Sequence, residues 1–177
     1  MRKTVLTFGL IGGGIIAILM SATVPFAHRI GFDKGVIVGY TTMVAAFLMI
    51  FFGIRSYREN VGDGKISFGR GVAVGMLITL IVTVCYVATW EVMYFKFMPD
   101  FCDKYAAYAI EKARAAGASA QKIQATADEM KRFKVMLDNP FINAALTFTE
   151  PFPIGLIVTL ISAAILRKKS GAPATQP

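Results

Sequence analysis

Residues 71–90 read GVAVGMLITLIVTVCYVATW, and none of these twenty side chains carries a charge. At 1.5 Å per residue, a helix of this length rises about 30 Å, which matches the hydrocarbon thickness of a bilayer. Four apolar runs of this kind follow one another along the chain, at 4–24, 35–54, 71–98 and 141–166. We therefore predict an all-α integral membrane protein with four transmembrane helices.

The composition is not that of a soluble domain. Only 17% of the 177 residues are charged, whereas soluble domains carry about 25%, and the mean hydropathy is +0.58. The net charge of +8 does not indicate a nucleic-acid partner, because the basic residues stand at the ends of the apolar runs. We expect a single membrane domain over 1–177 whose partners are the lipid bilayer and its anionic phospholipids.

The basic residues also predict how the chain is oriented. The loop 55–70 holds four of them, and the two ends of the chain carry two and three more. The segment 91–140 is longer and almost balanced, with eight basic and seven acidic residues. Because cytoplasmic loops are enriched in Lys and Arg, both termini and the loop 55–70 are predicted to be cytoplasmic, and the long segment external.

The external segment is predicted to be a helical hairpin over 100–139, between the third and fourth spans. In its first half, Phe101, Tyr105 and Tyr108 fall on one helical face. Ser119 is a suitable N-cap for a second helix. The apolar faces of the hairpin either pack on each other or on lipid headgroups, or they form a docking surface for a membrane or periplasmic protein.

Paired glycines indicate close helix packing. Three pairs have the small-xxx-small spacing, namely Gly9 with Gly13, Gly35 with Gly39, and Gly71 with Gly75. We expect packing within the bundle, and the alternative is a face for self-association into a homo-oligomer. No phosphate-binding loop is indicated, because no Gly-Lys-Ser/Thr follows the glycines.

Glu91 and Glu150 form a candidate intramembrane polar site. A carboxylate within a span is costly and usually faces a partner or a water-filled cavity. Both residues lie toward the outer leaflet in the predicted topology. Pro151 and Pro153 loosen the helix beside Glu150 because proline lacks a backbone donor. This arrangement could bind a cation or relay a proton.

A structural role for the two glutamates is the alternative. Glu91 neighbours Trp90, which is typical of a membrane interface. Glu150 could cap the first turn of a helix, where the dipole favours negative charge. Either carboxylate could also pair with Lys96 or Arg29.

The cytoplasmic loop offers candidate contacts to anionic lipid headgroups, namely Arg55, Arg58, Lys65 and Arg70. These residues are alternatively plain topology signals. We expect no catalytic, cofactor-binding or metal site. His28 is the single histidine, and no cluster with metal-ligand spacing accompanies it.

Several stretches together resemble a known family. They are FFGIRSYREN at 51–60, KISFGRG at 65–71, GMLITLI at 75–81, FMPDFCDKY at 97–105, GASAQKIQ at 117–124 and EPFPIGLIVTLISAAILRKK at 150–169. Their order is similar to that of the bacterial membrane family called domain of unknown function 4199, common in the Bacteroidota. The resemblance implies four spans in a bacterial inner membrane, and it brings no activity, cofactor or active-site residue.

Two functions follow as hypotheses. The first is a non-enzymatic scaffold or accessory subunit of a cell-envelope complex, with the hairpin as its docking element. The alternative is a small oligomeric transporter or flippase component that uses Glu91 and Glu150. The resemblance also associates such a component with the handling of lipid-linked sugars.

Overall fold

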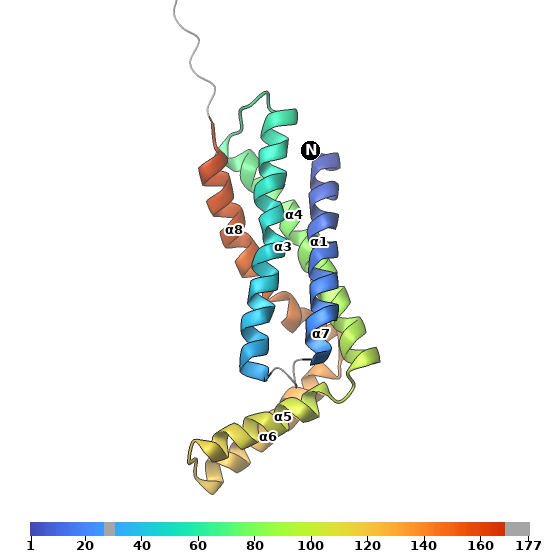
Figure 1. Cartoon of the computed structure of the whole chain (residues 1–177), viewed down its shortest axis with the longest axis vertical. Coiled ribbons are helices and arrows are strands. Elements are labelled where there is room, and N and C mark those ends of the chain that lie inside the picture. The colour runs from blue at the N-terminus through green and yellow to red at the C-terminus, as the bar shows by residue number, and fades with distance from the viewer. Residues whose placement is uncertain (27–30, 169–177) are drawn as a thin grey trace, which may run out of the picture.

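The computed structural model describes residues 1–26 and 31–168, and its regular elements are all helical (Figure 1). In chain order these elements are α1 (Arg2–Thr23), η1 (Val24–Phe26), α3 (Phe32–Asn60), α4 (Phe68–Val92), η2 (Met93–Phe97), α5 (Phe101–Ala115), α6 (Ala120–Leu137), α7 (Pro140–Phe148) and α8 (Pro151–Leu166). Four segments are long and apolar enough to span a membrane: Arg2–Phe26, Phe32–Asn60, Phe68–Phe97 and Pro140–Leu166. The prediction of an all-α protein with four such helices is confirmed.

The four long segments form a bundle in which α4 is central. α4 packs against α1, α3 and α8, and α3 also packs against α1 and α8. The core between them is aliphatic and aromatic, with Phe47, Ile54 and Ile78 fully buried. Polar contacts also cross the bundle, and in one of them the hydroxyl oxygens of Thr79 and Thr159 lie 3.0 Å apart. Such side-chain hydrogen bonds help to hold helices together in lipid.

Glycines set how closely the helices approach. A Cβ on Gly13 would lie 2.5 Å from the Cys85 Sγ, and one on Gly75 would lie 2.7 Å from the Thr159 Cγ2. Two of the three predicted pairs, Gly9 with Gly13 and Gly71 with Gly75, therefore pack within the bundle. Their small faces are already used between helices of the same chain.

α5 and α6 lie side by side beyond one end of the bundle (Figure 1). α5 ends at a turn in which Gly117 has a φ of +72°, a conformation that glycine adopts without strain. Ser119 then caps α6, since its hydroxyl accepts a hydrogen bond from the Lys122 amide at 3.3 Å. Lys134 of α6 and Asp103 of α5 form an ion pair at 2.7 Å.

Two of the long segments are irregular near this end. Residues Met93–Phe97 form a π-helical turn, in which the Met98 amide bonds to the Met93 carbonyl at 2.9 Å. The fourth segment is divided between Phe148 and Pro151 into α7 and α8. Pro151 and Pro153 cause the division, because they remove two amide donors that a continuous helix needs.

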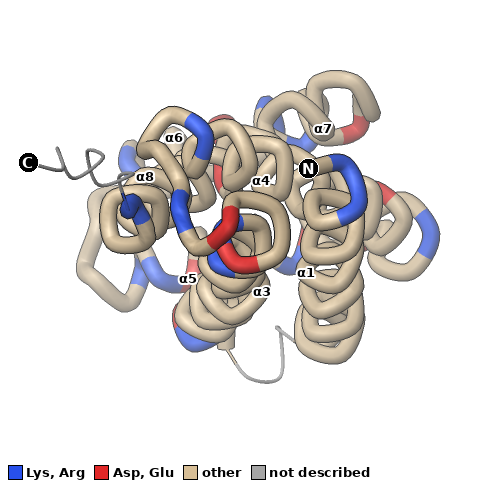
Figure 2. Tube along the Cα trace, turned by 90° about the horizontal axis from the view of Figure 1, so that it is seen from above, with Lys and Arg blue, Asp and Glu red and all other residues tan. Residues whose placement is uncertain are grey.

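Charge is distributed very unevenly between the two ends of the bundle. In the ranges 1–3, 55–70 and 167–168 there are eight basic and two acidic residues, whereas 33–34 and 91–150 hold nine of each. Figure 2 looks down on the basic end, with blue at the start of α1 and the end of α8. Among the described residues, the excess positive charge is therefore confined to one end.

Candidate functional site

A cavity of about 470 Å³ lies where the bundle meets α5 and α6. This volume falls in the range of small-molecule sites, about 300–1,000 Å³. The lining comes from η1, α3, α4, α5, α6, α7 and the residue between α7 and α8, and consists of Val24, Phe32, Gly35, Val36, Gly39, Tyr40, Met43, Tyr86, Trp90, Phe101, Tyr105, Phe133, Leu137, Leu146, Thr147 and Glu150. The wall is therefore mostly apolar and rich in aromatic rings.

Glu150 is the single carboxylate among these lining residues. Tyr86 of α4 donates its hydroxyl to the Glu150 Oε2 at 2.8 Å. Glu150 stands at the N-cap position of α8, but its side chain makes no capping hydrogen bond there. Glu150 therefore has the predicted cap position, but its side chain is directed to Tyr86 and not to the amides of the first turn of α8.

Glu91 lies apart from this site. It is five residues after Tyr86 on the same helix, which places it about 140° around the helix axis. It does not line the cavity, and its Oε1 is buried without a hydrogen-bond partner among the described residues. The structure therefore does not bring Glu91 and Glu150 together.

Of the two ion pairs considered for the glutamates, the structure tests the one with Lys96. Neither carboxylate forms an ion pair with Lys96 in the described part of the chain. Arg29 and His28 lie outside the described residues.

Asn143 of α7 organises the wall beside Glu150. It is fully buried, and its Oδ1 accepts hydrogen bonds from the Trp90 Nε1 at 2.9 Å and from the Thr147 hydroxyl at 3.1 Å. Its amide nitrogen donates to the Leu137 carbonyl at 2.9 Å. One side chain thus joins α4, the end of α6 and α7, and holds Trp90 in the cavity wall.

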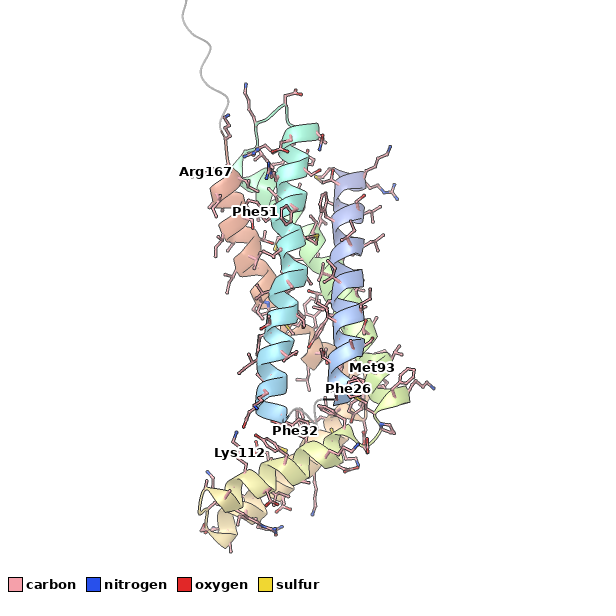
Figure 3. The ribbon with its side chains drawn as sticks, in the orientation of Figure 1. Phe26, Phe32, Phe51, Met93, Lys112 and Arg167 are labelled. Atoms are coloured by element: carbon pink, nitrogen blue, oxygen red, sulfur yellow. The ribbon has the colours of Figure 1, made fainter. Side chains whose placement is uncertain are left out.

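The aromatic face of α5 closes the cavity against the start of α3. The Phe32 ring lies 6.0 Å from Phe101, 5.3 Å from Tyr105 and 5.1 Å from Tyr108, between ring centroids. Figure 3 shows Phe32 at this junction, with Lys112 nearby on α5. The predicted stripe of α5 therefore packs around a residue of the bundle.

An ion pair lies at the outer edge of the same junction. Lys112 donates to the Asp33 Oδ1 at 2.8 Å and to the Tyr108 hydroxyl at 3.3 Å. The hydrogen bond to the Asp33 carboxylate raises the pKa of Lys112. Both partners are exposed, so this contact contributes little to stability by comparison with the rings.

The third glycine pair has a different place from the other two. Gly35 and Gly39 both line the cavity, and a Cβ on Gly39 would meet no atom within 4 Å. Their lack of side chains keeps this wall of the cavity open.

The four candidate lipid contacts lie at the basic end, far from the cavity. Arg55 and Arg58 both bond to the Glu59 Oε1, at 3.0 and 3.2 Å. Arg58 also donates to the Leu166 carbonyl at 3.4 Å. Lys65 and Arg70 form no ion pair within the described residues, so these two cations are available to other anions.

Sequence reasoning did not single out Tyr86, Asn143 or Tyr40. Asn143 carried a signal, because it is the one amide in the apolar run 141–166. Tyr86 and Tyr40 carried none, since single tyrosines are ordinary in membrane helices.

Residues 7–168 match the family described as "Protein of unknown function (DUF4199)". The chain belongs to this family. The resemblance seen in the sequence is thus confirmed, and the DUF4199 region contains every residue that lines the cavity. No curated protein and no solved structure matches the chain.

The cavity presents few polar side chains. Its lining pairs a carboxylate with a tyrosine, and the lining residues include no histidine, cysteine or lysine that could serve as a nucleophile or base. Across the described residues no group of three metal-ligating side chains comes together. The arrangement offers an apolar volume with a polar point at one wall.

Proposed function

We propose that this chain is a non-enzymatic membrane protein that binds a membrane amphiphile in the cavity, as an accessory subunit of a cell-envelope complex in a bacterial inner membrane. The observation that carries the proposal is the cavity itself. An apolar volume with a few polar groups is the usual form of a small-molecule site, and here its wall is built from both the bundle and the α5–α6 pair.

The excess of basic residues at one end of the bundle supports a membrane orientation in which the cavity faces outward. With the basic end in the cytoplasm, both termini are cytoplasmic and α5 and α6 are outside the membrane. The cavity then lies at the outer membrane–water interface, where tryptophan and tyrosine side chains such as Trp90 and Tyr105 are enriched. An acyl chain could occupy the apolar part while its headgroup stays near Glu150.

Mild purification from native membranes, followed by mass spectrometry of the co-eluting lipids and proteins, tests the proposal. Gly39→Leu is the informative variant, because it fills the cavity without a clash at the Cβ. Gly14→Leu is its matched control, since a Cβ there also meets nothing within 4 Å and Gly14 does not line the cavity.

We expect the wild-type protein and Gly14→Leu to retain one amphiphile, and Gly39→Leu to lose it while remaining folded. A partner protein that co-elutes in stoichiometric amount would identify the complex. Equal lipid retention by all three proteins would show that the cavity is not the binding site.

A second candidate function is a small oligomeric transporter or flippase component. The division between α7 and α8 favours it, because transport sites are typically formed at broken membrane helices. Glu150 stands at this break and Glu91 does not line the site. Glu150→Gln should therefore abolish transport in a reconstituted vesicle assay, with Glu91→Gln less affected. Normal transport by Glu150→Gln would exclude this role.

A further inference from the structure

We infer that the cavity selects amphiphiles whose headgroup bears an ammonium group, bound between Glu150 and the surrounding aromatic rings. The inference rests on the proposed amphiphile site and adds the chemical class of its ligand. It follows from which hydrogen-bonding atoms the wall leaves free.

The polar donors around Glu150 are already engaged. The Tyr86 hydroxyl donates a hydrogen bond to the Glu150 Oε2 at 2.8 Å. The Trp90 Nε1 and the Thr147 hydroxyl both donate to the Asn143 Oδ1, at 2.9 and 3.1 Å. What these bonded side chains leave free is therefore acceptor capacity, notably the second carboxylate oxygen and the Tyr86 hydroxyl oxygen.

The remaining lining residues do not favour an anionic headgroup. Tyr40 and Tyr105 add hydroxyls that can donate or accept. No lysine or arginine lines the cavity, so a phosphate or carboxylate placed near Glu150 would meet like charge without compensation. A ligand that supplies donors and positive charge fits this wall best.

The aromatic rings strengthen the preference for a cation. Tyr40, Tyr86, Trp90, Phe101 and Tyr105 all line the cavity, and the faces of such rings attract ammonium groups. Sites that recognise ammonium ligands commonly use aromatic rings in this way. A purely hydrocarbon ligand fits this wall less well, because an alkane offers no hydrogen-bond donor or positive charge to the Glu150 carboxylate.

The protein carries its own reporter for a binding experiment. Trp90 is the one tryptophan in the chain and it lines the cavity. Brominated ligands that enter will therefore quench the intrinsic fluorescence of that residue. We would titrate the purified full chain in a polyoxyethylene detergent with 11-bromoundecylamine, 11-bromoundecanol and 11-bromoundecanoic acid.

We expect saturable quenching by the amine with about tenfold tighter binding than by the alcohol, the difference that one charge-assisted hydrogen bond produces. The acid should bind more weakly than the alcohol. Glu150→Gln should bind the amine and the alcohol equally, and its retained alcohol binding reports an intact cavity. Glu91→Gln, which lies off the cavity, should behave as the wild type.

The outcomes separate the two proposals. Equal binding of amine and alcohol by the wild type would overturn the ammonium preference while leaving the amphiphile site standing. A preference that persists in Glu150→Gln would overturn it as well. Quenching that never saturates with any probe would overturn both proposals.

Further probes distinguish the source of the ammonium group. Brominated phosphatidylethanolamine and brominated phosphatidylglycerol carry the same chains with different headgroups. Saturable quenching by the first alone would identify an aminophospholipid as the ligand. Binding of the single-chain amine without either phospholipid would identify a smaller amphiphilic amine.

Discussion

At the scale of single residues, Asn143 matters most to the candidate site. Its amide is fully buried and has three hydrogen-bond partners, on Trp90, Thr147 and Leu137. In lipid no water replaces a lost partner, so a change to an apolar residue leaves those groups unsatisfied. The side chain of Glu150 beside it bonds to Tyr86 alone among the described residues, and it lines the cavity. One residue therefore holds the wall, and the other is available to a ligand.

Asn143→Leu should lower the free energy of unfolding by about 1–3 kcal/mol, the cost of leaving buried donors and acceptors unpaired. We expect a clear fall in melting temperature in detergent, together with a shift of the Trp90 emission. Asn60→Ala is the control, because Asn60 is exposed and bonds only within its own helix. An unchanged melting temperature for Asn143→Leu would contradict the role assigned to the amide.

Cys102 gives a prediction that depends on pH. Its side chain is 6% exposed, and its Sγ lies 3.3 Å from the Tyr94 hydroxyl. Burial raises the pKa of the Cys102 thiol above its ordinary value, and only the thiolate reacts with alkylating reagents. The thiolate fraction at pH 8 is therefore lower than in an exposed cysteine.

In a Cys85→Ala background, the alkylation of Cys102 should be slow at pH 8 and should still be rising above pH 9. Unfolding in sodium dodecyl sulfate should restore the rate and pH profile of an ordinary thiol. A profile in the native protein that levels off near pH 8.5, about the value for a free thiol, would contradict the prediction.

At the scale of elements, the contact between α1 and α4 requires a glycine at position 13 but not at the neighbouring position 14. A Cβ on Gly13 would lie 2.5 Å from the Cys85 Sγ and 2.9 Å from its Cβ, whereas a Cβ on Gly14 would meet nothing within 4 Å. Gly13→Leu should cost about 1–3 kcal/mol, as overpacking usually does. Gly14→Leu gains the same helix propensity as Gly13→Leu, and it should not destabilise the protein. Equal melting temperatures would show that the helices are not packed as described.

The junction of α3 with α5 should depend on aromatic packing more than on charge. Phe32 contacts three rings, and aromatic pairs contribute about 0.5–1.5 kcal/mol each beyond burial. The Lys112–Asp33 pair is exposed on both sides, and water screens such surface pairs so that they add little to stability. Phe32→Ala should therefore speed hydrogen exchange throughout α5, and Lys112→Ala should change it little. Faster exchange of α5 in Lys112→Ala than in Phe32→Ala would show that the ion pair, and not the aromatic packing, holds the junction together.

These elements also show what the sequence could and could not predict. Uncharged runs such as 71–90 predict long apolar helices directly, because run length alone decides whether a helix can cross a bilayer. The surroundings of Glu150 were not predictable, because the break before Pro151 makes the direction of its side chain independent of the rest of the span. The position of Glu150 within the apolar run predicts its depth in the membrane. Its partner Tyr86 could not be predicted in this way, because the contact depends on how each helix is rotated about its own axis.

The cavity could not be predicted from the sequence for a related reason. The spacing of Gly35 and Gly39 is the same as that of the two pairs that pack between helices, yet both of these glycines line the cavity, and a Cβ on Gly39 would meet nothing within 4 Å. A small residue permits close approach and equally permits a void. Which of the two occurs depends on the neighbouring element, and here the neighbour is α5, more than sixty residues further along the chain.

At the scale of the whole molecule, the charge asymmetry between the two ends predicts the orientation. The end that contains both described termini holds eight basic and two acidic residues, and the end with α5 and α6 holds nine of each. Positive segments are retained on the cytoplasmic side during insertion. The cavity should accordingly open toward the outer leaflet, and the α5–α6 turn should be accessible from outside.

Single cysteines test this orientation in a background without Cys85 and Cys102. Ala116→Cys places a thiol at the exposed turn between α5 and α6, and Asn60→Cys places one at the exposed basic end. A membrane-impermeant maleimide should label Ala116→Cys in bacterial cells whose outer membrane has been permeabilised, and should label Asn60→Cys only in inside-out vesicles. The opposite labelling pattern would show that the protein has the inverse orientation in the membrane, and the ammonium site would then take its ligand from the cytoplasmic leaflet. Labelling of both positions from one side would be incompatible with four spans, since an α4 that crosses the membrane must separate them.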